Sequence, residues 1–179
     1  MMHSRAKQDR KKITCTPIGV IHSEHTAAEQ TPIQPAYAKG CPGRVEVFPE
    51  YAEGLKDLDG FSHIILLYHF HVAGEPKLIV QPFLEDVPKG VFATRHPERP
   101  NRIGFSVVRL LRIERTSLLV EDVDVINGTP LLDIKPYVPR FDLVKNACGG
   151  WTERVPQATA RKRGRRGYPG KVPGPKPDP

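Results

Sequence analysis

Short stretches of alternating or continuous apolar residues run along most of the chain, and this pattern is typical of strands. We expect strands at residues 18–22, 44–48, 61–72, 103–114, 118–125 and 131–135. The stretch at 61–72 is apolar on both faces and predicts a central strand. Residues 24–42 and 73–90 predict long loops, and Pro49 begins a short helix over 49–58. Many short strands with little helix favour a mainly β fold, either a barrel or a sandwich.

The charge is distributed unevenly along the chain. Residues 1–12 carry a net charge of +4 and residues 161–179 carry +6, so the part between them is acidic although the whole chain carries +7. Nine of the last nineteen residues are Pro or Gly, a composition that predicts no helix. We therefore expect a disordered basic segment at 1–12, one β domain at 13–155 and a disordered, Pro/Gly-rich basic tail at 156–179. A basic tail suits RNA, and a solvated end without a partner is the open alternative.

Several function classes are disfavoured by what the sequence lacks. No apolar run is long enough to span a membrane, and no signal-peptide pattern follows the charged start. Three widely spaced cysteines fit a reducing compartment, so we expect a cytoplasmic protein. A Gly-rich loop between strand and helix is missing, and so is a Gly-x-Ser-x-Gly motif, which argues against the usual dinucleotide, ATP and serine-hydrolase sites.

Three histidines, His63, His69 and His71, alternate along the 61–72 stretch and would share one face. Such a set could bind a metal, but no cysteine or carboxylate lies beside it at ligand spacing. We therefore expect core or pocket-lining histidines and no metal site. His71, next to the following loop, is the best pocket candidate.

The block at 90–106, GVFATRHPERPNRIGFS, is the richest in candidate chemistry. It holds Arg95, Arg99 and Arg102 together with His96, and its two prolines stiffen the backbone. A rigid loop of arginines suits a carboxylate or phosphate, because the guanidinium group binds such anions through two hydrogen bonds. The alternative is a surface loop whose arginines pair with nearby acids.

A second dense block, NGTPLLDIKPY, spans residues 127–137. Asn127 and Gly128 predict a tight turn whose backbone could approach a ligand closely. Asp133 and Lys135 share one face of the following strand, where an ion pair between them is the favoured interpretation.

Together these blocks resemble the TrmO/TsaA-like family, the β-barrel type of S-adenosylmethionine-dependent transfer RNA methyltransferases. The resemblance covers about residues 15–142. It rests on ordered motifs that read PIGVIHS at 17–23, PIQ at 32–34, EGL at 53–55 with GFSH at 60–63, GVFATR at 90–95, RPN at 99–101 with IG at 103–104, and GTP at 128–130 with DIKPY at 133–137.

The resemblance implies a compact β-barrel with one or two short helices, acting as a homodimer on tRNA. The family reaction methylates N6 of threonylcarbamoyl-adenosine at tRNA position 37. The family's S-adenosylmethionine site maps onto Pro32, Ile33, Gln34, Phe70, His71, Val72, Arg95, Phe105, Asp124, Val125, Ile126, Asn127 and Gly128.

For this reaction we expect Arg95 and Tyr137 to act in catalysis and Arg99, Asn101, Arg102 and Lys135 to bind the substrate. His96, Asp133 and Tyr137 are the open candidates for a general base. Two further interpretations stay open. One is a methyltransferase of the same fold that acts on another nucleoside or a small molecule, and the other is a binding module for S-adenosylmethionine or RNA without catalysis.

The sequence also departs from the family pattern. Arg102 stands where the family usually has proline, and Asn127 stands where it usually has aspartate. Bacterial members carry a further C-terminal domain after the barrel, whereas this chain continues into a basic segment.

Overall fold

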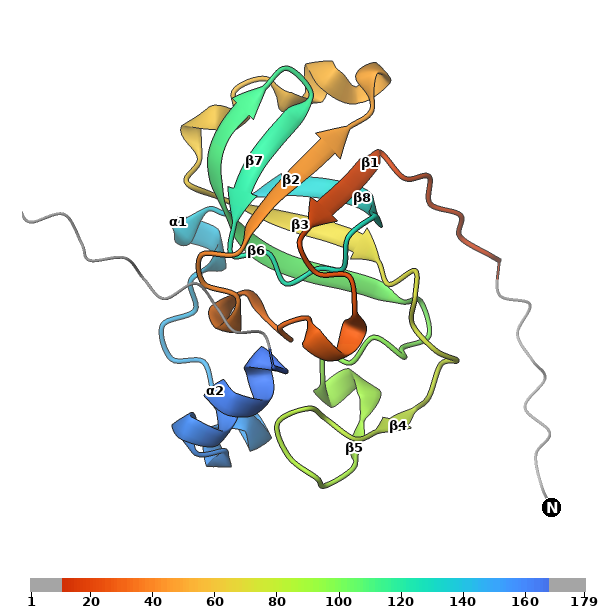
Figure 1. The fold of residues 1–179 in the computed structure, drawn as a ribbon, viewed down its shortest axis with the longest axis vertical. Coiled ribbons are helices and arrows are strands. Elements are labelled where there is room, and N and C mark those ends of the chain that lie inside the picture. Colours follow the sequence, from red (N-terminus) through yellow and green to blue (C-terminus); the bar gives the residue numbers. More distant parts are fainter. Residues whose placement is uncertain (1–10, 168–179) are drawn as a thin grey trace, which may run out of the picture.

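Six antiparallel strands close into a barrel in the computed structural model, which describes residues 11–167 (Figure 1). Around the barrel the order is β1 (Gly19–Ser23), β2 (Pro42–Val47), β7 (Ser117–Glu121), β6 (Ile103–Glu114), β3 (His63–His69) and β8 (Thr129–Pro136). The ladder between β1 and β8 closes the ring, with Ile21 opposite Thr129 and Gly19 opposite Leu131. The barrel inferred from the family resemblance is therefore confirmed.

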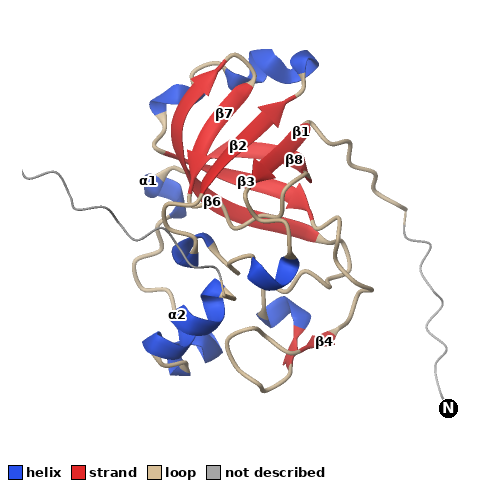
Figure 2. Ribbon diagram, in the orientation of Figure 1, coloured by secondary structure: helices blue, strands red, loops and turns tan. Residues whose placement is uncertain are grey.

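Short helices and one small sheet occupy the connections between strands and the segment after β8 (Figure 2). The 3₁₀ turns are η1 (Ala28–Gln30), η2 (Pro35–Tyr37), η3 (Pro49–Leu55), η4 (Leu58–Gly60), η5 (Val91–Ala93) and η6 (Gly150–Arg154). The α-helices are α1 (Pro139–Asp142) and α2 (Gln157–Arg165), and β4 (Ile79–Val80) pairs with β5 (Lys89–Gly90). The long connections after β1 and β3 gather with α2 at one end of the barrel, while η3 lies at the other end (Figure 1).

The barrel interior is filled by every second residue of the strands. Ile64, Leu66 and Tyr68 of β3 are buried, whereas the residues between them are half-buried on the outer face. The predicted central strand is thus shorter than 61–72 and buries one face more than the other. Side chains from the other strands, such as Val108 and Leu118, complete one contiguous core.

Two further expectations need correction. The helix predicted at 49–58 is the 3₁₀ turn η3, and the strand predicted at 118–125 ends at Glu121. Asp122 has a φ of 69°, a left-handed backbone conformation that ends the extended strand.

The prediction of a helix-free, disordered segment from residue 156 onward is wrong for α2. Ala160 is buried, and the ring of Tyr37 packs against Gly164 where a side chain would otherwise stand. The Gly164 carbonyl also accepts the backbone N–H of Ile33 at 2.9 Å. Most of the Pro and Gly residues of the range 161–179 lie after α2. The average composition of that range therefore concealed a short stretch that can form a helix. Residues 1–10 and 168–179, which hold most of the first predicted disordered segment and half of the second, lie outside the described residues.

One close contact in the barrel wall gives a stability test. Gly104 of β6 lies opposite Tyr68, and a Cβ atom added to Gly104 would stand 2.0 Å from the Tyr68 ring. Gly104→Ala should therefore lower the free energy of unfolding by about 1–3 kcal/mol, since the buried ring must move. Gly60→Ala is the matched control, because nothing lies within 4 Å of the Cβ position at Gly60. Equal urea denaturation midpoints for the two variants would contradict this account of the wall.

Candidate functional site

A cavity of about 380 Å³ opens at the end of the barrel where the long connections gather. Its lining comes from the loop after β1, the end of β3, the block at 94–99, the start of β6 and the segment before β8. Cavities of this size are in the range that holds small-molecule ligands, about 300–1,000 Å³. Segments far apart in sequence therefore meet around one ligand-sized space.

Most residues that the family resemblance assigned to the donor site line this cavity. They are Pro32, Ile33, Gln34, Phe70, His71, Val72, Arg95, Phe105, Asp124, Val125 and Ile126, and Arg99 lines it with them. Of the other expected residues, Asn101, Arg102, Asn127, Gly128, Lys135 and Tyr137 do not line it.

Arg95 links the two loops that flank the cavity. Its guanidinium group donates a hydrogen bond to the Gln34 side-chain carbonyl and lies 5.4 Å from the centre of the Phe105 ring. A hydrogen bond and a cation–π contact both restrict where the charge can lie. The structure thus holds one cation at a defined place in the cavity wall.

A buried chain of polar groups forms the cavity floor. The Tyr68 hydroxyl lies 2.9 Å from Ser106 Oγ, and Ser106 Oγ donates to Asp124 Oδ1 at 2.6 Å. Because the single Ser106 hydrogen is used on Asp124, Tyr68 donates to Ser106. All three residues are buried, although Tyr68 and Asp124 also line the cavity.

Burial raises the pKa of two acidic groups at the cavity floor, Asp124 and Tyr68. It raises the pKa of Asp124 to about 7, against the opposing effects of the Ser106 hydrogen bond and the Arg95 charge. It also raises the pKa of Tyr68 well above its ordinary value. The cavity floor therefore contains a carboxyl group that changes charge near neutral pH.

Sequence reasoning missed Tyr68, Ser106 and Arg166. Tyr68 and Ser106 occupy inward positions of β3 and β6, so a hydroxyl within an otherwise apolar inward face was the available signal. Arg166 follows α2 and lines the cavity, with its guanidinium carbon 4.5 Å from the centre of the Phe83 ring. Nothing in the composition of the basic segment distinguished Arg166 from its neighbours.

His71 lies where the sequence placed it, at the cavity beside the end of β3. Its Nδ1 atom is 3.3 Å from the Thr129 hydroxyl, whose hydrogen goes to the Ile126 carbonyl at 2.7 Å. Burial, followed by the nearby His69, lowers the pKa of His71. Within the part of the chain that the structure describes, no group of three or more His, Cys, Asp or Glu residues could hold a metal ion.

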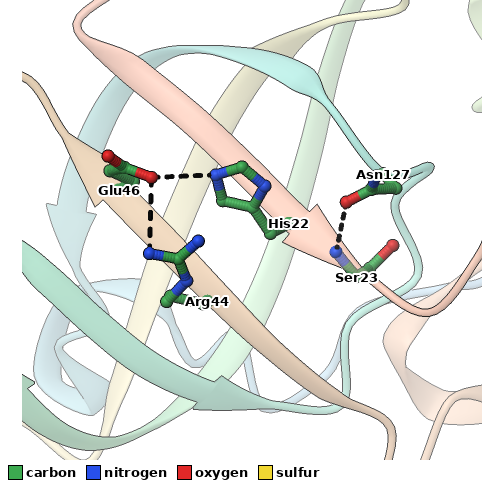
Figure 3. A network of polar contacts seen from close by, with 5 residues as sticks. All are labelled: His22, Ser23, Arg44, Glu46 and Asn127. Carbon is green, nitrogen blue, oxygen red and sulfur yellow. Dashed lines mark hydrogen bonds and ion pairs between the residues drawn. The ribbon is translucent and has the colours of Figure 1, made fainter.

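Asn127 and Gly128 shape the turn before β8. The Asn127 side-chain carbonyl accepts the Ser23 backbone N–H at 3.2 Å (Figure 3), and the Asn127 backbone N–H donates to the His25 carbonyl. Gly128 has a φ of 80°, in the left-handed region that favours glycine. These contacts fasten the turn to the end of β1, so both residues support the cavity wall from outside.

A second cluster in Figure 3 lies on the neighbouring strands β1 and β2. Glu46 Oε2 is 3.1 Å from His22 Nε2 and 3.4 Å from an Arg44 nitrogen. All three side chains are partly exposed, so this cluster belongs to the outer surface of the barrel.

Arg102 stands outside the cavity with a left-handed backbone. Its φ is 51°, which proline cannot adopt because its ring fixes φ near about −65°. The Arg102 side chain lies 3.5 Å from a Glu75 carboxylate oxygen, and its carbonyl accepts the Phe70 N–H. A protein with proline at this position must therefore have another backbone conformation here than this chain has.

Lys135 and Tyr137 lie toward the other end of β8. Lys135 pairs with Asp133 at 2.6 Å, as the sequence favoured, and the Tyr137 ring packs edge-on near His63. Tyr137 is eight residues beyond Thr129, or about 25 Å at the rise of a strand. Neither Lys135 nor Tyr137 lines the cavity, so the roles expected for them from the sequence stay predictions.

Similarity to known proteins covers the whole barrel. The family model of the tRNA-methyltransferase O N-terminal domain matches residues 20–143. The chain belongs to this family. A probable S-adenosyl-L-methionine-binding protein of Pyrococcus abyssi is 55% identical over 138 residues, which are 77% of this chain and 75% of that protein.

Two further relatives extend this similarity to a named enzyme and to a solved structure. The human tRNA (adenine(37)-N6)-methyltransferase is 38% identical over 73% of this chain, which spans only 31% of the human protein. The crystal structure of TrmO from Pseudomonas aeruginosa matches with a TM-score of 0.67 and 39% identity, over 79% of this chain and 63% of that one. The chain thus spans only part of the length of these two relatives.

The buried Asp124 predicts an unusual dependence of stability on pH. Its pKa is about 7 in the folded protein and about 3.9 when unfolded, so folding favours the neutral acid and loses stability as pH rises through this window. Between pH 5 and pH 8 this group should cost about 2–3 kcal/mol. Asp124→Asn keeps an oxygen acceptor for Ser106 and should remove that loss, as measured by urea denaturation at both pH values.

Asp59→Asn is the matched control for this measurement, because Asp59 is exposed. Its unfolding free energy should change with pH as in the unaltered protein. The same change between pH 5 and pH 8 in Asp124→Asn would show that Asp124 is not held neutral by the fold.

Proposed function

We propose that this protein is an S-adenosylmethionine-dependent methyltransferase that acts on N6 of threonylcarbamoyl-adenosine at position 37 of tRNA. The observation that carries the proposal is the convergence of loop 32–34, residues 70–72, Arg95, Phe105 and residues 124–126 on one cavity. The names of the Pyrococcus and human relatives support the donor and the reaction, respectively.

The residues of the cavity fit the proposed methyl donor. Apolar side chains such as Phe70, Val125 and Ile126 offer surface for the adenosyl group. Arg95 offers a cation for the donor's carboxylate, and the Asp124 carboxyl offers negative charge for its cationic centre. When bound, S-adenosylmethionine supplies a methyl group on a positively charged sulfur that a nitrogen nucleophile can attack in line.

The chain's own contribution is alignment and charge. Gln34 and Phe105 hold Arg95, and the Ser106 hydrogen bond orients Asp124. Fixing two reactants side by side supplies a large part of the rate of such a displacement. Arg99, which also lines the cavity, is placed to receive the carboxylate of the threonylcarbamoyl group or a phosphate.

The sequence offers His96, Asp133 and Tyr137 as candidates for a general base. Asp133 pairs with Lys135 and Tyr137 lies beside His63, both away from the cavity. His96 does not line this cavity either, and burial lowers its pKa, which leaves a neutral imidazole near pH 7. Its Nδ1 atom already accepts the Glu98 backbone N–H, so we expect water to take the proton that N6 gives up on methylation.

The proposal includes a homodimer in the cytoplasm, as for the family that the sequence resembles. Exposed apolar side chains, including Phe141, Leu143 and Val144 after β8, offer surface for a second copy of the chain. Within the described residues no helix is long and apolar enough to cross a membrane.

Mass spectrometry of tRNA nucleosides tests the reaction directly. Purified protein with S-adenosylmethionine should add one methyl group to tRNA that carries threonylcarbamoyl-adenosine and should leave tRNA without that group unmodified. Arg95→Ala should reduce kcat/KM by about 100-fold or more while the melting temperature stays close to that of the unaltered protein.

Arg112→Ala is the control for loss of a cation, because Arg112 lies on the exposed face of β6 beside Glu114. It should retain full turnover. Full turnover in Arg95→Ala would instead remove Arg95 from the site, and methylation of the unmodified tRNA would assign the enzyme another nucleoside.

The charge of Asp124 predicts how donor affinity changes with pH. From pH 6 to pH 8 the carboxyl group loses its proton, so affinity for the cationic S-adenosylmethionine should rise by up to about tenfold. S-adenosylhomocysteine has a neutral sulfur and should show a smaller change. Calorimetry with both ligands measures this, and Asp124→Asn should flatten the dependence. Parallel pH curves for the two ligands would separate Asp124 from the sulfonium.

A further inference from the structure

A second cavity of about 570 Å³ lies directly against the first. The two share Ile33, Gln34, Phe83, Thr94 and Arg95 in their linings, so the hydrogen-bonded pair of Gln34 and Arg95 forms part of the partition between them. A ligand in the second cavity would therefore be a neighbour of a ligand in the first.

Aromatic rings dominate the walls of this second cavity. Tyr37, Phe83, Phe92, His96 and Trp151 all line it. Phe92 is 77% exposed, which is a large apolar area to leave in water. Flat rings of this kind are what proteins use to stack unpaired nucleic-acid bases, at about 1–3 kcal/mol per base.

One wall comes from the C-terminal segment that follows the family domain. Trp151 lies beyond residue 143, where the family match ends. Its Nε1 hydrogen is donated to the Ala93 carbonyl at 2.8 Å, and the Lys89 ammonium lies 5.8 Å from the ring centre. The indole is thereby fixed against the same block, 90–106, that carries Arg95.

His96 offers a polar edge within these apolar walls. Its ring stacks on Phe83 at a centroid distance of 5.1 Å, and its Nδ1 atom accepts the Glu98 backbone N–H. A neutral His96 therefore carries its hydrogen on Nε2. Adenine presents ring-nitrogen acceptors to such a donor, whereas its exocyclic N6 would remain for reaction.

We propose that the second cavity binds the acceptor adenine of the RNA, stacked against Trp151 and Phe92 with N6 toward the Gln34–Arg95 partition. This inference rests on the proposed methyltransferase function and names the subsite for its nucleic-acid substrate. A base in a single-stranded loop can be turned out of its stack at low cost, and a cavity of about 570 Å³ can receive it.

The transfer then takes place where the two cavities adjoin, with N6 in direct contact with the methyl carbon. The N6 lone pair forms the bond to the methyl carbon while the carbon–sulfur bond breaks, and that electron pair stays on sulfur. The hydrogen of N6 leaves as a proton, which water accepts. Atoms and charge balance without an oxidant or reductant.

Trp151 is the single tryptophan of the chain and so reports on this subsite directly. An anticodon stem-loop RNA with adenine at position 37 should quench its fluorescence, because a stacked base contacts the indole. The same RNA with an abasic site at position 37 should bind with little quenching. Equal quenching by both RNAs would overturn the proposal.

Variants of two rings that line the second cavity provide the functional test. Trp151→Ala and Phe92→Ala should each reduce kcat/KM for tRNA by about 5- to 150-fold, the equivalent of one lost stack. Trp151→Phe should recover much of that loss. Leu111→Ala is the matched control, since Leu111 is 52% exposed and lines neither of these two cavities.

Calorimetry with S-adenosylmethionine separates the two proposals. Donor affinity within twofold of the unaltered protein in Trp151→Ala, together with lost RNA turnover, supports the subsite. Full turnover in both ring variants overturns the subsite and leaves the methyltransferase standing. An unaltered protein that neither binds the donor nor methylates tRNA overturns the proposed function itself.

Discussion

The ladder between β1 and β8 closes the barrel, and the position of every loop around the cavity depends on it. The ladder places Ile21, near the end of β1, opposite Thr129, at the start of β8. The loop that follows β1 and the turn that precedes β8 must therefore leave the barrel side by side. Antiparallel pairing of β3 with β6 has the same effect, since His69 lies opposite Ile103. Two strand pairs thus bring four distant segments of the chain to one end.

Much of the barrel could be predicted from the sequence because strand periodicity is local. The strand predicted at 103–114 is confirmed at both ends, and β1, β2 and β8 fall within a few residues of their predicted places. Helical segments were less predictable. η3 is a 3₁₀ turn rather than an α-helix, and α2 depends on contacts with Tyr37 and Ile33, more than a hundred residues away, that no local pattern reveals.

The candidate site, too, could be predicted from the sequence only in part. Arg95 and its loop could be identified from the sequence, since arginines on a proline-stiffened loop are a local signal, and the family resemblance supplied the other donor residues. The polar chain of Tyr68, Ser106 and Asp124 could not be assembled in advance, because it requires β3, β6 and the turn before β8 to meet across the closed barrel. Tyr137 is the opposite case. It is close to Thr129 in sequence, but the length of β8 places it far from the cavity.

The packing at Gly104 limits how the ligand specificity of such a protein can change. The glycine and the Tyr68 ring packed on it belong to the barrel wall and to the cavity lining at once. A substitution that reshapes this floor also disturbs the core, so selection for a new ligand would meet a loss of stability there. The loops and the C-terminal segment line the cavities but do not form the barrel wall. New specificities in this architecture should therefore arise at the rim, while the floor is inherited unchanged.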